Sequence, residues 1–234
     1  MPEDVGTHLF IYQGLVLRLD EDVQVPKAGT LLLARQIPAL AHGSVLDLGT
    51  GCGLLALLAT RSANRVVATD VIEACVRCTR RNALLNGCEV QIDVRLGDLF
   101  APVVGETFDL IMTNPPQMPT PQDRKADGNE AAADNGGPDG WAILDQVIRE
   151  APAHLKPEGR LVFTLFDFLG EQNGLRRLKE AGLSPAVLAQ ETQPFPRLAR
   201  ERLNYIRSTC GEHTLPPIGM PATCERLVIC GRRA

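Results

Sequence analysis

The stretch SVLDLGTGCGLLALLA, residues 44–59, decides the fold. An apolar segment that contains Asp47 is followed by Gly49, Gly51 and Gly53, and an apolar helical pattern comes next. Glycines at alternate positions let the backbone turn sharply and approach a ligand, and the helix beyond them directs its N-terminal amides toward that ligand. The stretch therefore predicts a strand, a ligand-binding loop and a helix in a parallel α/β sheet.

Outside this stretch, short apolar runs alternate with helical patterns, which is typical of βαβ units. The expected fold class is α/β, with a Rossmann-like sheet. The expected strands are Ser44–Leu48, Arg65–Thr69, Val90–Arg95, Phe108–Thr113, Arg160–Phe166, Pro185–Gln190 and Arg226–Cys230. The expected helices are Gly53–Thr60, Ile72–Asn86, Gly140–His154 and Gly170–Ala181.

Two additions flank the expected core. His8–Tyr12 and Leu15–Leu19 predict a hairpin and Thr30–Ala39 predicts a helix, and we expect this addition to cover the edge of the sheet. Residues 117–140 lack periodicity, and a loop of that length is usually functional. The expected organisation is one domain over residues 1–234, with an N-terminal addition (1–43), a core (44–194), a lid-like insertion (195–224) and the last strand (225–234).

Composition narrows the class of protein. The chain has 234 residues, a formal net charge of −4 and seven cysteines, and a sequence pI near 5.6. The acidic balance makes nucleic acid the less favoured partner, and the odd cysteine count fits a reducing, cytoplasmic setting. No apolar run has membrane-spanning length. Cys75 and Cys78 form a CxxC inside an expected helix without a second pair, so we expect no metal site.

Charge also bears on the ligand of the glycine loop. Residues 51–56 satisfy a GxGxxA dinucleotide pattern, but Asp47 would repel a pyrophosphate and attract an ammonium group. Asp70 ends the next strand, where a carboxylate reaches ribose hydroxyls. Asp98 and Leu99 follow the third strand and suit an adenine amine and its ring. These residues favour a ligand with a cationic group, while a helix cap at Asp70 and an ordinary turn at Asp98 stay open.

Asn114, Pro115 and Pro116 follow the fourth expected strand and predict a slot for an amine. The Asn114 side-chain carbonyl and the Pro115 backbone carbonyl can together accept two N–H bonds, and consecutive prolines leave a rigid rim without N–H donors. Such a slot aims the lone pair of the amine at an electrophilic carbon. The chemistry requires no metal.

These motifs, in this order and spacing, resemble the class I S-adenosylmethionine-dependent methyltransferases. The closer resemblance, over about residues 25–181, is to the branch of the release-factor glutamine methyltransferases and small-domain RNA amino-methyltransferases. It implies a seven-stranded sheet with a reversed final hairpin and S-adenosylmethionine as cofactor. The cofactor contacts that it implies are Asp47, Gly49, Thr50, Gly51, Gly53, Asp70, Val71, Asp98, Leu99 and Asn114.

One position departs from this branch, in which an aromatic residue follows the prolines and stacks on a planar target. Gln117 has no aromatic face and offers a donor and an acceptor to a small polar partner. The expected catalytic set is therefore Asn114, Pro115 and Gln117. Tyr12, Thr30 and Tyr205 lie in the two additions and are the expected substrate contacts; either tyrosine could replace the missing aromatic.

Several functions fit these motifs. The leading interpretation is a methyltransferase that acts on an amine of a small molecule or peptide, for example in natural-product biosynthesis, with S-adenosylhomocysteine as the second product. One alternative is a cyclase that converts S-adenosylmethionine to azetidine-2-carboxylate and methylthioadenosine without an acceptor. Another is an RNA or release-factor amino-methyltransferase. A cofactor-binding protein without catalysis and a dehydrogenase are less favoured, because Asn-Pro-Pro has no role in either.

Overall fold

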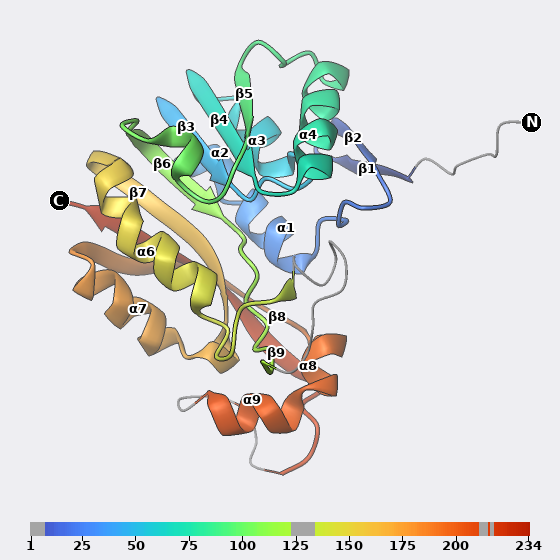
Figure 1. Ribbon diagram of the computed structural model, residues 1–234, viewed down its shortest axis with the longest axis vertical. Coiled ribbons are helices and arrows are strands. Elements are labelled where there is room, and N and C mark those ends of the chain that lie inside the picture. Colours follow the sequence, from blue (N-terminus) through green and yellow to red (C-terminus); the bar gives the residue numbers. More distant parts are fainter. Residues whose placement is uncertain (1–7, 123–133, 211–214, 216–217) are drawn as a thin grey trace, which may run out of the picture.

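The computed structural model describes residues 8–122, 134–210, 215 and 218–234. Within these residues a seven-stranded sheet runs through the molecule with helices on both faces (Figure 1). Its strands are β3 (Ser44–Leu48), β4 (Arg65–Asp70), β5 (Ile92–Leu96), β6 (Phe108–Thr113), β7 (Leu155–Phe166), β8 (Leu183–Pro194) and β9 (Thr223–Arg233). The strand order is β5-β4-β3-β6-β7-β9-β8; β9 runs antiparallel to both β7 and β8, and the other neighbouring strands are parallel. The expected α/β sheet with a reversed final hairpin is confirmed.

Successive side chains of each strand point to opposite faces of the sheet, and the core therefore has two layers. In β3, Val45 contributes to the cluster on one face of the sheet, whereas Leu46 and Leu48 contribute to the cluster on the other. Central strands of a parallel sheet are apolar on both faces because helices cover both. The helices are α1 (Ala28–Ala34), α2 (Ile37–Leu40), α3 (Leu54–Ala59), α4 (Glu73–Leu85), α6 (Ala142–His154), α7 (Glu171–Glu180), α8 (Arg197–Glu201) and α9 (Leu203–Thr209), with 3₁₀ turns at Ala101–Val103 and Asp167–Leu169.

The register of the sheet brings the expected motifs to one edge. Leu48 at the end of β3 pairs with Thr69 of β4 on one side and with Thr113 of β6 on the other. Asp70 in turn pairs with Leu96 at the end of β5. The residues that follow these strands therefore meet at the carboxyl edge, where open α/β sheets bind ligands at the point at which strand order reverses.

The N-terminal hairpin is separate from the main sheet. Strands β1 (His8–Tyr12) and β2 (Leu15–Leu19) form a two-stranded sheet of their own and add no strand to the edge of the main one. The hairpin instead packs on α4: Asn86 exchanges two hydrogen bonds with the backbone of Val16, at 3.0 and 2.8 Å. Asn82 accepts a third from Arg18 N–H, at 2.9 Å. Amide side chains near the end of α4 satisfy the unpaired edge of β2 and so fix the hairpin there.

The final hairpin is longer than expected, because β8 and β9 pair continuously from Leu183–Arg233 to Pro194–Thr223 with one irregularity. The insertion that starts at residue 195 therefore caps this hairpin. It contacts the segment after Asn-Pro-Pro, where Arg202 donates to the Pro119 carbonyl and to Thr120 Oγ1 at 3.0 and 2.6 Å. The expected helix over 30–39 is divided into α1 and α2. No helix in the described part of the chain has the length and apolar character to cross a membrane.

Candidate active site

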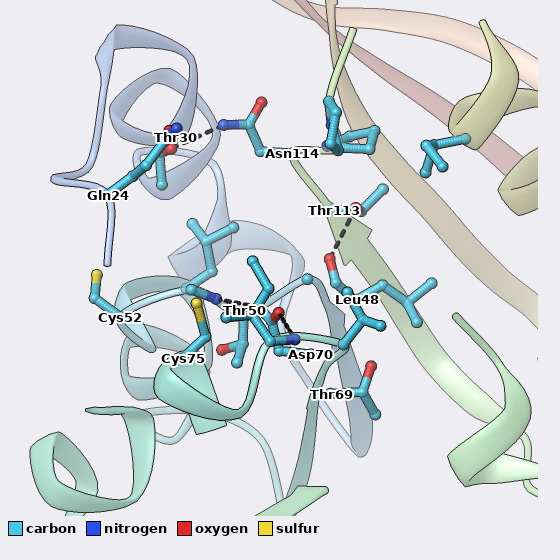
Figure 2. Close-up of a pocket in the computed structure, with 18 of the residues that line it drawn as sticks. Gln24, Thr30, Leu48, Thr50, Cys52, Thr69, Asp70, Cys75, Thr113 and Asn114 are labelled. Atoms are coloured by element: carbon cyan, nitrogen blue, oxygen red, sulfur yellow. Dashed lines mark hydrogen bonds between the residues drawn. The ribbon is translucent and has the colours of Figure 1, made fainter. Parts of the chain in front are cut away.

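A cavity of about 290 Å³ opens at the carboxyl ends of β3, β4 and β6, as Figure 2 shows. The glycine loop, the turn after β5 and the start of α1 complete its wall. Most of the residues expected in the site line it: Thr30, Gly49, Thr50, Gly51, Asp70, Val71, Asp98, Leu99, Asn114 and Pro115. The other five expected site residues lie outside this wall: Asp47, Gly53, Gln117, Tyr12 and Tyr205.

Asp70 fixes the glycine loop to the end of β4. Its two carboxylate oxygens accept the backbone N–H groups of Gly51 and Ile72, each at 2.9 Å. Burial raises the pKa of Asp70, while these backbone hydrogen bonds lower it. Gly51 itself has φ of 58°, and a Cβ there would meet no atom within 4 Å. The glycine is therefore required by its left-handed backbone and by the open space that it leaves for a ligand.

Asp47 lies beneath the same loop rather than in the cavity. It is 1% exposed, and its Oδ2 accepts hydrogen bonds from Thr50 Oγ1 at 2.7 Å and from Ala56 N–H at 3.1 Å. Burial raises its pKa to about 7 in spite of these two bonds. The other oxygen, Oδ1, has no hydrogen-bond partner among the described residues. The expected contact between Asp47 and an ammonium group stays a prediction, since the carboxylate is enclosed and its hydrogen bonds shape the loop.

The wall of the cavity fits a cationic adenosine cofactor. Val71 is 63% exposed, and with Leu99 and Ile143 it provides apolar surface for a ring. Asp70 and Asp98 lie in the same wall, near the end of β4 and after β5. The described lining includes a third acid, Asp22, and a single basic residue, Lys27. This balance favours S-adenosylmethionine over a pyrophosphate-containing dinucleotide. No group of three or more His, Cys, Asp or Glu in the described residues could hold a metal ion.

Asn114 is held by three elements at once. Its amide nitrogen donates to Thr30 Oγ1 of α1 at 2.9 Å (Figure 2). Its carbonyl oxygen accepts hydrogen bonds from Thr164 Oγ1 of β7 and from Arg226 Nη2 of β9, the latter at 2.7 Å. The sequence predicts Asn114 directly after β6, with its side-chain carbonyl facing a substrate. In the structure that carbonyl instead accepts hydrogen bonds from two side chains of the protein itself.

Gln117 has a different place from the one expected. Its side chain is 3% exposed, and its Nε2 donates to the carbonyl oxygen and, at 3.3 Å, to Oγ1 of Thr164. Its Oε1 accepts the backbone N–H of Phe166, also at 3.3 Å. The amide that was expected to meet a small polar partner is thus used to attach the segment after Asn-Pro-Pro to β7. The missing aromatic residue is therefore no indication of a small substrate.

The two tyrosines lie away from the cavity. Tyr12 stacks on Phe10 within the β1–β2 hairpin, with ring centroids 6.4 Å apart. Tyr205 lies on α9 and lines a separate hollow with Arg200, Asn204 and Met220. Neither replaces the aromatic residue after the prolines in this structure. Of the three expected substrate contacts, Thr30 lines the cavity.

Arg226 is a site residue that the sequence analysis missed. Its side chain is 5% exposed and its guanidinium lies 3.7 Å from the centroid of the Phe166 ring. Nε and Nη1 have no hydrogen-bond partner among the described residues. Burial lowers the pKa of Arg226 to about 9, so it is charged at neutral pH. A signal was present, because Arg226 directly precedes Leu227–Cys230, an apolar run that is buried on both faces of the sheet.

The chain is similar in sequence to protein glutamine methyltransferases. The model of the methyltransferase small domain family matches residues 24–130. A Methanocaldococcus jannaschii protein with the provisional name protein N5-glutamine methyltransferase is 34% identical over 187 residues, which cover 80% of this chain and 93% of that protein. A release factor glutamine methyltransferase of Cereibacter sphaeroides is 34% identical over 209 residues, with 85% and 73% covered. A ribosomal protein uL3 glutamine methyltransferase of Bradyrhizobium diazoefficiens is 36% identical over 170 residues, with 64% and 53% covered.

Solved structures agree on the fold. A tRNA methyltransferase of M. jannaschii has a TM-score of 0.65 at 13% identity, over 97% of this chain and 57% of that one. A methyltransferase from Pyrococcus furiosus has a TM-score of 0.55 at 21% identity, over 91% and 88%. Sequence identities this low support the fold alone. With the more similar relatives above, the chain belongs to the class I S-adenosylmethionine-dependent methyltransferases, in the branch of the release-factor glutamine methyltransferases and small-domain methyltransferases.

Proposed function

We propose that this methyltransferase transfers the methyl group of S-adenosylmethionine to the side-chain amide nitrogen of a glutamine in a protein or peptide. The observation that carries the proposal is the meeting of Asn114 and Pro115 with the glycine loop in one cavity. The names of the relatives supply the acceptor, since release factors and ribosomal protein uL3 are methylated on glutamine according to them. Release factors and uL3 are therefore the first candidate substrates.

Bound S-adenosylmethionine supplies an electrophilic methyl group on a sulfonium. The amide nitrogen of the glutamine forms a bond to the methyl carbon as the carbon–sulfur bond breaks, S-adenosylhomocysteine leaves, and the nitrogen loses one proton to solvent. Asn114 and Pro115 contribute by holding the planar amide beside the glycine loop, which is a gain of proximity and orientation. Asp70, Val71, Asp98 and Leu99 are proposed to hold the adenosine part, because they line the same cavity.

The leading interpretation from the sequence was an amine of a small molecule or peptide; the small molecule has no support among the relatives, and neither does a natural-product pathway. It rested on Gln117, whose amide is buried against β7. The cyclase alternative rested on the same residue and on a site closed by the two additions. No described residue of the 195–224 insertion lines the cavity. Glutamine methylation, which matches the release-factor alternative from the sequence, is therefore the better-supported proposal.

The test combines the purified protein with S-adenosylmethionine and with release factors or uL3 of the same organism. Tandem mass spectrometry should place one methyl group on a glutamine side chain. Asn114→Ala should lower turnover at least about 100-fold while affinity for S-adenosylhomocysteine changes by less than about fivefold, because Asn114 orients the acceptor. Ser44→Ala is the control, because Ser44 begins β3 at the end of the strand away from the cavity. Turnover of Asn114→Ala within a few-fold of wild type would place the acceptor elsewhere.

A further inference from the structure

The hydrogen bonds around Asn114 have a fixed direction. A guanidinium can only donate, so the Asn114 atom that contacts Arg226 Nη2 at 2.7 Å must be the carbonyl oxygen. Thr164 Oγ1 accepts from Arg226 Nη2 at 2.6 Å and from Gln117 Nε2 at 3.3 Å. The hydroxyl hydrogen of Thr164 is thereby directed to the same Asn114 oxygen. Two donors from the protein therefore determine which end of the carboxamide faces them.

The opposite orientation of Asn114 is unfavourable. A flipped amide would place its NH₂ group against the N–H of Arg226, and two donors would face each other in a buried site. It would also present the carbonyl to Thr30, whose hydroxyl now accepts from Asn114 Nδ2 at 2.9 Å. A hydroxyl can donate as well as accept, so Thr30 alone does not decide the orientation. Arg226 does.

This orientation sets what the slot presents to an acceptor. A carbonyl oxygen has two lone pairs, and Thr164 and Arg226 use both. In Figure 2 this oxygen points away from Thr50 and Asp70, while the amide nitrogen points toward Thr30 in the wall of the cavity. The nitrogen has a second hydrogen, and Pro115 beside it has a carbonyl but no N–H. The slot thus has one donor and one acceptor, not two acceptors.

The charge of Arg226 acts in the same direction. In the described part of the chain no acidic side chain forms an ion pair with it, and the ring of Phe166 is its main compensation. A buried cation without a counter-charge is costly, which is a reason to look for a role in the site. The same uncompensated charge raises the free energy of a second cation near Asn114, because the surroundings screen it poorly.

We propose that Arg226 is a positioning residue that selects the acceptor class: it holds Asn114 with its NH₂ toward the cavity, so that the slot accepts a neutral primary carboxamide and rejects a protonated amine. A carboxamide supplies both an acceptor for Asn114 and donors for the Pro115 carbonyl. An ammonium group supplies donors alone and adds a positive charge. This inference rests on the proposed glutamine methylation and gives a reason for glutamine over lysine.

The kinetic test compares two peptides that differ in one residue, glutamine or lysine, and uses three variants of the protein. Arg226→Met removes the charge and the donor at similar volume, and we expect turnover of the glutamine peptide to fall at least tenfold at unchanged cofactor affinity. The ratio of lysine to glutamine methylation should rise. Arg226→Lys should restore part of the turnover and part of the preference for glutamine. Arg232 is exposed on the same strand, and Arg232→Met should change neither turnover nor preference. An equal loss on both peptides in Arg226→Met would show a merely structural role and overturn the proposal.

Asn114→Asp tests the donor directly, because aspartate keeps the oxygen that accepts from Thr164 and Arg226 and replaces the NH₂ donor with a second acceptor. We expect at least a hundredfold loss on the glutamine peptide. Folding is checked by thermal unfolding and by S-adenosylhomocysteine binding. A folded Asn114→Asp that retains activity within a few-fold of wild type would overturn the proposal, since two acceptors would then suffice.

A binding experiment separates this inference from the proposed function. Propionamide or propylammonium is titrated into ¹⁵N-labelled protein with S-adenosylhomocysteine, and the side-chain NH₂ resonances of Asn114 are assigned with Asn114→Asp. Propionamide should shift them and propylammonium should not. That result with no glutamine methylation would refute the proposed function and leave the selection of a carboxamide intact. A shift by propylammonium, or by neither probe, would refute the selection even if glutamine is methylated.

Discussion

Asp70→Ala should weaken cofactor binding and destabilise the fold together. Asp70 is 7% exposed, and its carboxylate accepts the N–H groups of Gly51 and Ile72, so the variant removes both bonds. Each unsatisfied N–H costs about 1–3 kcal/mol, and water from the cavity can relieve part of this, which gives about 2–4 kcal/mol in the free energy of unfolding. Lost bonds to the ribose add about 1–3 kcal/mol to binding, or roughly a 5- to 150-fold rise in Kd.

Calorimetry with S-adenosylhomocysteine measures the binding effect, and urea denaturation measures the stability. Asp70→Asn keeps one carbonyl oxygen as acceptor, so its affinity for S-adenosylhomocysteine and its free energy of unfolding should both lie between those of wild type and Asp70→Ala. Asp93→Ala on β5 is the matched control, because Asp93 is exposed and lies outside the cavity wall. A folded Asp70→Ala that binds the cofactor product within twofold of wild type would remove Asp70 from the site.

Two further changes test the buried groups around the cavity. The pKa of Asp47 is raised from 3.8 to about 7 in the folded protein, so its contribution to stability is present below about pH 4 and is lost as the pH rises to about 7. Wild type should lose a few kcal/mol of stability relative to Asp47→Asn over that range in urea denaturation, and a constant difference would contradict the assignment. Gln117→Tyr should lower the free energy of unfolding by about 1–3 kcal/mol, because the larger side chain overpacks a site that is 3% exposed and loses the hydrogen bonds of the Gln117 amide to Thr164 and Phe166. Improved activity on a planar substrate with unchanged stability would show that position 117 faces the acceptor.

The sequence predicted the features that depend on local pattern. Alternation and glycine spacing placed β3, the glycine loop and α3, and the ends of four parallel strands were close enough to bring Asp70, Asp98 and Asn114 to one edge. Parallel register makes such strand ends meet whatever the loops do. The position of the cavity was therefore predictable before any contact was known.

The orientation of Asn114 was not predictable in this way. It depends on Arg226, which is 112 residues further along the chain and reaches the site through the reversed pairing of β9 with β7. Gln117 was misplaced for a related reason, because its burial depends on Thr164 and Phe166 of β7, nearly fifty residues away. Residue type told us which groups could bond, and only tertiary packing determined which partners they found.

One reaction tests the central claim most directly. The protein is incubated with S-adenosylmethionine and a release factor or uL3, and the adenosine product and the protein product are both quantified by mass spectrometry. The account predicts S-adenosylhomocysteine in a one-to-one ratio with glutamine methylated on its side-chain nitrogen, and neither product above background without the acceptor. Methylthioadenosine formed from S-adenosylmethionine alone, or a methyl group on any residue other than glutamine, would contradict it.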